Sequence, residues 1–109
     1  MNIKEIEERS GLTRANIRYY EQEGLIAPVR RENKYRDYSE EDLETLLRIA
    51  LLRSLGFSLE EIRRLQSGEA DFAAAMRERS AALESEGQRL LAARNVCDAI
   101  SREVTSYSA

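Results

Sequence analysis

The chain has 109 residues, 42% of them apolar and 34% charged, with a net charge of −3 and no histidine. This length and composition predict one globular domain, or one domain with an appended helix, and no apolar run is long enough to span a membrane. Histidine is the commonest general base and metal ligand, and the single cysteine, Cys97, cannot form an internal disulfide. We therefore expect a cytoplasmic protein that is not an enzyme and has no cofactor and no metal site.

The positive charge is concentrated in one segment. Residues 13–36 contain six basic and three acidic side chains, a net charge of +3, whereas residues 39–71 contain four basic and eight acidic side chains, a net charge of −4. Four of the five tyrosines also lie in residues 13–38. Charges act on a partner over about one Debye length, ~10 Å, so a local cluster can bind a polyanion on an acidic protein. The pattern indicates an anionic partner.

Two short helices are expected at the start of the chain. Asn2 can cap a helix over residues 3–9, which Gly11 ends, and Thr13 can cap a second helix to about residue 22, which Gly24 closes. Two short helices joined by a tight turn that contains glycine are typical of a helix-turn-helix, whose second helix enters the DNA major groove.

Helical spacing divides the second helix into two faces. Ile17 and Tyr20 fall on one face, and Arg14 and Arg18 fall on the other, flanked by Tyr19. The arginine face is the candidate surface for reading DNA. The alternative is an ordinary solvated surface with two arginines, and this helix alone does not distinguish the two interpretations.

A hairpin is expected next. Pro28 favours extended backbone before it, residues 30–34 are turn-like, and residues 35–38 read as a short strand. A hairpin after a recognition helix is a wing, and its cationic tip would lie along the phosphate backbone. Alternatively, Tyr35 or Tyr38 packs in the core, and we expect this of one of them.

A second helix pair follows. Ser39 can cap a helix that ends near Gly56, and its second half is apolar nearly all round, so we expect a central core helix buried on several sides. Ser58 and Glu61 form a second capping box, which opens a fourth helix that finishes at Gly68.

The remaining residues predict a long helix with a seam. Apolar side chains recur from residue 76 to residue 104 at intervals of seven, and Phe72, Ala93 and Ile100 fill alternate positions. Arg79, Glu86 and Gly87 interrupt the seam, so we expect a short coiled coil rather than a long rod. Such a seam requires a partner, and the simplest partner is a second copy of the chain. We expect residues 1–69 to form one domain and residues 70–109 to form a dimerisation coiled coil through Phe72, Met76, Leu83, Leu90, Cys97, Ile100 and Val104.

Taken together, these motifs closely resemble those of the MerR (mercury-resistance regulator) family. The matching positions cover residues 1 to about 66: residues 11–13, 18–21, 24–26 and 55–62, with Pro28, Arg31, Asn33, Tyr35, Arg36 and Tyr38. The resemblance implies a mainly α fold, a winged helix-turn-helix with a second helix pair and a long C-terminal coiled-coil helix. It also implies a homodimer with an antiparallel coiled coil that binds and distorts a pseudo-palindromic promoter, and so acts on RNA polymerase indirectly.

The resemblance also implies roles for individual residues. Arg18 and Tyr19 would contact DNA from the recognition helix, where Thr13 and Arg14 also face the groove. Other residues, at the helix end and in the wing, would contact or position the DNA backbone. The full set of candidate DNA-binding residues is Thr13, Arg14, Arg18, Tyr19, Tyr20, Arg31, Lys34, Tyr35, Arg36 and Tyr38.

Metal sensing is disfavoured, and the effector is not identified. Metal-sensing members of the family carry a cysteine at the start of the dimerisation helix and a cysteine pair beyond it, whereas residues 71–76 contain none and no larger effector domain is expected within these residues. The alternative to a DNA-binding regulator is a coiled-coil interaction module that has kept the fold and lost DNA binding. The intact basic and tyrosine positions argue against that alternative.

Overall fold

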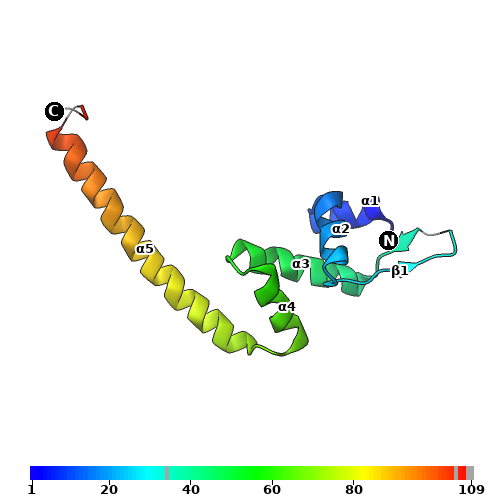
Figure 1. Cartoon of the computed structure of the whole chain (residues 1–109). Coiled ribbons are helices and arrows are strands. Elements are labelled where there is room, and N and C mark those ends of the chain that lie inside the picture. Colours follow the sequence, from blue (N-terminus) through cyan, green and yellow to red (C-terminus); the bar gives the residue numbers. More distant parts are fainter. Residues whose placement is uncertain (34, 105, 108–109) are drawn as a thin grey trace. The chain divides into compact units, whose positions relative to one another are not determined.

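The computed structural model describes residues 1–33, 35–104 and 106–107. The chain separates into two compact units, Met1–Glu69 and Ala70–Ala109. The first unit contains a set of short helices and a small hairpin, and the second contains one long helix (Figure 1).

Helices α1 (Ile3–Ser10) and α2 (Arg14–Gln22) form the expected helix-turn-helix, and their bounds agree with the prediction to within one residue. The Asn2 side chain accepts a hydrogen bond from the Glu5 backbone N–H at 2.9 Å and caps α1. Gly11 has φ 73°, a left-handed conformation that side chains disfavour, and it ends α1. The Thr13 hydroxyl then accepts from Asn16 N–H at 3.2 Å and caps α2.

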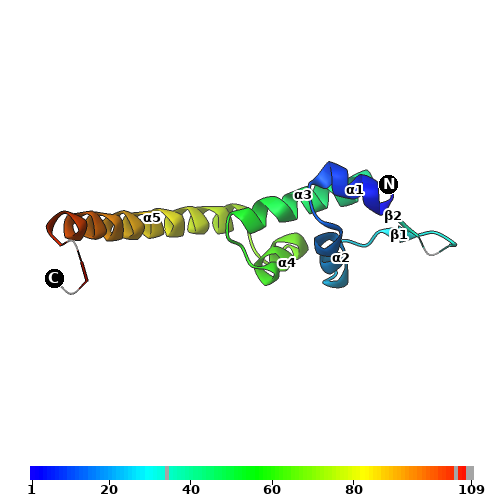
Figure 2. The same cartoon turned by 90° about the horizontal axis from the view of Figure 1, so that it is seen from above.

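The wing is a small antiparallel hairpin of β1 (Val29–Arg30) and β2 (Arg36–Asp37), in which Arg30 lies opposite Arg36. Both views show it projecting beyond the helices of the first unit (Figure 1, Figure 2). The paired part of the strand is shorter than the expected residues 35–38. Past β2, the Tyr38 N–H donates to the Met1 carbonyl at 2.7 Å, which ties the hairpin to the start of α1.

Helices α3 (Glu40–Ser54) and α4 (Leu59–Ser67) complete the first unit. Both are capped by the expected serines, Ser39 and Ser58, each in a reciprocal capping box. The Arg63 guanidinium on α4 donates to the Glu23 carbonyl at 2.9 Å and so ties α4 to the end of α2. The core is formed by Ile6, Ile17, Tyr20, Leu25, Ile26, Tyr38, Leu43, Leu46, Ile49, Leu52, Phe57 and Ile62.

The expectation that α3 is buried on several sides is wrong. Leu46, Ile49 and Leu52 are buried, but Leu47 is 45% exposed and Leu51 is 58% exposed. Residues four apart share a helix face, so Leu47 and Leu51 form one stripe that points away from the core. Within the first unit, α1 and α4 pack against α3, and this small unit leaves the Leu47 and Leu51 stripe uncovered in the single chain.

The second unit is α5 (Phe72–Glu103), which begins where the Asp71 carboxylate accepts from Ala74 N–H at 2.9 Å. None of its residues is buried, and Cys97, which we expected as a buried hydrophobe on a seam, is exposed in the single chain. Within the described residues, no helix is both long enough and apolar enough to cross a membrane.

Candidate nucleic-acid interface

The two faces of α2 are arranged as the helical spacing predicts. Ile17 and Tyr20 are buried against the core, and Arg14, Arg18 and Tyr19 are exposed on the opposite side. The apolar face fixes the rotation of the helix, because turning it would expose Ile17. The arginines therefore point outward from a rigid element.

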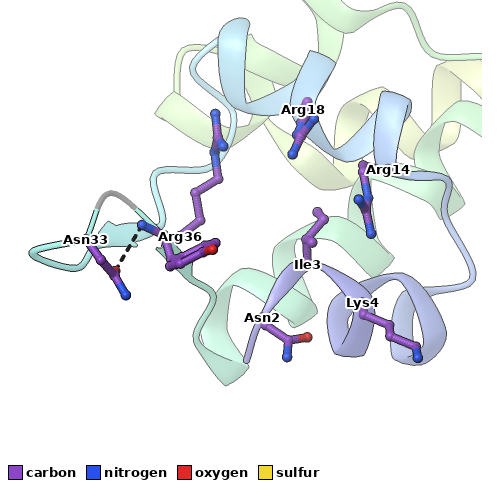
Figure 3. Close-up of a pocket in the computed structure, with 8 residues that line it drawn as sticks. Asn2, Ile3, Lys4, Arg14, Arg18, Asn33 and Arg36 are labelled. Carbon is purple, nitrogen blue, oxygen red and sulfur yellow. Dashed lines mark hydrogen bonds between the residues drawn. The ribbon is translucent and has the colours of Figure 1, made fainter.

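A hollow joins α2, the wing and the start of α1. It is lined by Arg14 and Arg18 from α2, Tyr35 and Arg36 from the wing segment, Asn33 from its turn, and Asn2, Ile3 and Lys4. Figure 3 shows Arg14 and Arg18 extending from α2 toward Ile3, and Arg36 rising from the wing. Four cationic side chains line this concave surface, so it is suited to an anionic ligand with an extended backbone.

Sequence reasoning missed the contribution of the first helix. Asn2, Ile3 and Lys4 line the hollow but were not among the candidate residues. One signal was available, because the first helix of a helix-turn-helix crosses the DNA backbone, and Lys4 lies in its first turn. Asn33 was also missed as a lining residue; its side chain accepts from the Tyr35 N–H at 3.2 Å and shapes the turn of the wing.

The candidate tyrosines fall into two groups. Tyr19 is 44% exposed and Tyr35 is 73% exposed, whereas Tyr20 is buried and Tyr38 is 1% exposed. The resemblance implies that Tyr20 and Tyr38 contact or position the DNA backbone, and the burial of both side chains favours positioning. The Tyr38 hydroxyl has no hydrogen-bond partner within the described part of the chain, and burial raises the pKa of Tyr38.

Most candidate arginines are held by carboxylates of the same unit. Arg14 Nε lies 2.7 Å from Glu7 Oε1, Arg31 pairs with Asp37, and Arg36 Nε lies 2.8 Å from Glu21 Oε2. The Glu21 hydrogen bond raises the pKa of Arg36, and the Met1 ammonium and then Arg31 lower the pKa of Asp37.

Arg18 differs from these arginines, because it makes no ion pair with any described residue. Of the two candidate cations on α2, the Arg18 guanidinium is therefore the one that can bind an anionic ligand without first breaking an ion pair within the first unit. Thr13 is exposed and caps the N-terminus of α2. The remaining candidate, Lys34, lies outside the described residues.

The candidate dimerisation residues lie along the second unit. All but one belong to α5, and Val104 is its C-terminal cap residue. Large apolar side chains stay exposed along the helix, those of Phe72, Leu83, Leu90, Ile100 and Val104 among them, and Met76 is half-buried. The candidate dimerisation residues therefore contribute exposed apolar surface in the single chain.

The fold and the site together define a winged helix-turn-helix protein with a second helix pair and a long C-terminal helix. Residues 1–69 match the family model described as "MerR HTH family regulatory protein", and the chain belongs to this family. HTH-type transcriptional regulator HmrR of Rhizobium leguminosarum bv. viciae is 54% identical over 65 residues, which cover 60% of this chain and 50% of that protein. The chain spans about half the length of the curated relatives it matches.

Solved structures extend the similarity over nearly the whole chain. The N-terminal part of MtaN, the Bacillus subtilis multidrug transporter activator, has a TM-score of 0.78 and 29% identity, covering 97% of this chain and 99% of that one. EcmrR, solved as an EcmrR–DNA complex in EcmrR-RPo, has a TM-score of 0.71 and 25% identity, covering 94% of this chain and 40% of that one. The curated relatives are transcriptional regulators rather than enzymes.

Proposed function

We propose that the protein is a sequence-specific transcriptional regulator that binds a pseudo-palindromic promoter as a homodimer and distorts it. The observation that carries this proposal is the hollow lined by Arg14 and Arg18 of α2, Arg36 of the wing and Lys4 of α1. A recognition helix and a wing that present cations to one surface fit a major groove and its flanking phosphates. Family membership and the DNA-bound relative EcmrR support the same function.

The two halves of the interface have different roles in this proposal. Arg14, Arg18 and Tyr19 face the groove, where arginine can bond a guanine edge with two donors. Arg31, Tyr35 and Arg36, together with Lys34, serve the phosphate backbone from the wing. Thr13 lies at the groove end of α2, and Tyr20 and Tyr38 act from the core by positioning the helix and the wing.

The second unit supplies dimerisation. In the proposal, the exposed apolar residues of α5 pair with a second copy in an antiparallel coiled coil, so that two first units read two half-sites. Distortion of the promoter between the half-sites would act on RNA polymerase indirectly. The proposed location of this activity is the cytoplasm. A metal effector is not part of the proposal, because the 109 residues contain one cysteine and no histidine.

Selection of bound sequences from a random duplex pool tests the proposal. A symmetric pair of half-sites should emerge, and the affinity for the selected duplex should fall steeply with salt, because each neutralised phosphate releases counterions. No binding to any duplex at low salt, with the dimer confirmed, would contradict the proposal and favour a coiled-coil interaction module without DNA.

Two arginine variants test the division of roles. Arg18→Ala should weaken binding to the selected duplex by about 1 to 3 kcal/mol and relax base preference at one position of each half-site. Arg36→Ala should weaken binding to all duplexes alike and flatten the salt dependence. Competition assays with selected and scrambled duplexes distinguish the two patterns, and equal loss of specificity in both variants would contradict the assignment.

A further inference from the structure

Glu21 lies in the last turn of α2, one residue after the buried Tyr20, and its side chain is only 14% exposed. Its carboxylate accepts from Arg36 Nε at 3.0 Å through Oε1 and at 2.8 Å through Oε2, and Arg30 Nη2 lies 3.5 Å from Oε1. Arg30 is on β1 and Arg36 on β2. One carboxylate of the recognition helix therefore holds both strands of the wing.

The wing requires such a contact for two reasons. Each strand contributes two residues, and a two-stranded hairpin is at best marginally stable by itself. In addition, Arg30 and Arg36 are cross-strand partners, and like charges directly opposite one another destabilise a hairpin. Glu21 places a negative charge against both guanidinium groups and removes that repulsion.

We propose that Glu21 is a positioning residue for DNA binding, which sets the wing against the recognition helix and orients Arg36. The Arg36 side chain is 27% exposed and bonds Glu21 through Nε. In the described part of the chain its two Nη groups make no hydrogen bond, so they stay available for a phosphate while Nε fixes the guanidinium plane. This inference rests on the proposed function.

Neutralising Glu21 should change the affinity for DNA in the direction opposite to the one that simple electrostatics predicts. A carboxylate beside a DNA-binding surface repels phosphates, so its neutralisation alone would strengthen binding. If Glu21 positions the wing, neutralisation weakens binding instead, because Arg30 and Arg36 then repel each other and the wing loses its fixed direction.

The binding test compares Glu21→Gln with Glu32→Gln in the full chain, on a duplex selected from the random pool. Glu32 is exposed in the turn of the wing. Glu32→Gln is the matched control, because it also removes one carboxylate. Glu21→Gln should lower the affinity about tenfold, the scale of a hydrogen bond to a charged group, whereas Glu32→Gln should leave it unchanged or raise it. Affinity in Glu21→Gln equal to or above that of the wild type would overturn the inference.

A second measurement needs no DNA. Amide hydrogen exchange at the wing, read at the Arg31 N–H that donates to the Tyr35 carbonyl and at the Tyr38 N–H, should be faster in Glu21→Gln. Amides of α3 should exchange as in the wild type, which shows that the variant is folded. Unchanged exchange at the wing would overturn the inference even if affinity fell. If the wild type bound no duplex, the proposed function would fail, and faster exchange at the wing would still support the contact between Glu21 and the wing.

Discussion

Two tyrosines of the wing segment, three residues apart, have opposite surroundings. Tyr38 is 1% exposed and Tyr35 is 73% exposed. In extended backbone, residues an odd number apart point to opposite faces, so the core can take one of the pair and leave the other outside. The expectation that one of them packs in the core is confirmed, and the buried one is Tyr38.

Tyr38→Phe tests whether burial removes this tyrosine from DNA contact. The hydroxyl is buried without a partner among the described residues, so its removal should leave the free energy of unfolding unchanged or raise it by about 1 kcal/mol. Affinity for the selected duplex should not change, whereas Tyr35→Phe, the matched control, should lower it. Urea unfolding and duplex binding measure the two effects, and weaker binding by Tyr38→Phe would show that its hydroxyl reaches DNA.

Between elements, charged pairs hold the helices of the first unit together. The guanidinium of Arg9 on α1 meets the carboxylate of Glu40 on α3 at 2.6 Å through Nη1 and at 3.1 Å through Nη2. The hydrogen bond from Arg9 lowers the pKa of Glu40 below its ordinary value of 4.5. The pair is exposed, so its contribution is small, but it connects the first helix of the chain to the third.

Acid should weaken this connection in a predictable direction. Because the pKa of Glu40 is depressed in the folded state, its stabilising contribution is present above pH 4.5 and is lost as the pH falls through the lower folded value. The difference in unfolding midpoint between the wild type and Glu40→Gln should therefore be larger at pH 7 than at pH 3. Urea titrations at both pH values measure it, and an equal difference at both would show that the ion pair does not contribute.

The sequence predicted those elements that are determined locally. Asn2, Thr13, Ser39 and Ser58 each cap the helix that follows, and Gly11 and Gly68 end helices in left-handed conformations, so the helix bounds could be read from short stretches. The burial of Ile17 followed from helical spacing in the same way.

Features that depend on distant parts of the chain were not predictable. Leu47 and Leu51 look like core residues until the elements around α3 are known. The pairing of Glu21 with Arg36 joins residues 15 positions apart, and that of Arg9 with Glu40 joins residues 31 apart. Local patterns carry no information on which of several carboxylates an arginine will meet, so the sequence identified the arginines of the site but neither Lys4 nor the groups that orient the arginines.

At the scale of the whole molecule, charge and apolar surface are divided between regions. The chain has a net charge of −3, yet the candidate interface gathers Lys4, Arg14, Arg18 and Arg36. Exposed apolar side chains instead concentrate on α5. This division suits a protein in which one unit binds DNA and the other joins two copies.

Leu90→Glu tests the assignment of α5 to dimerisation. Leu90 is exposed and lies in the middle of the proposed seam, where a second copy would bury it, and a charge buried there without a partner is strongly unfavourable. Sedimentation should show a dimer for the wild type and a monomer for the variant. An unchanged dimer would refute the seam; Glu84→Gln, an exposed change on the same helix outside the seam, should stay dimeric.

The uninterrupted course of α5 restricts how this protein can change in length. Each residue of a helix turns the chain by about 100°, so an insertion of one residue would rotate every later side chain out of line with those before it. A seam with a seven-residue interval stays in line when seven residues are added or lost, whereas adding or losing a single residue disrupts it. In the history of such a gene, α5 should therefore grow and shrink in units of 21 base pairs, whereas the turn of the wing has no comparable period to preserve.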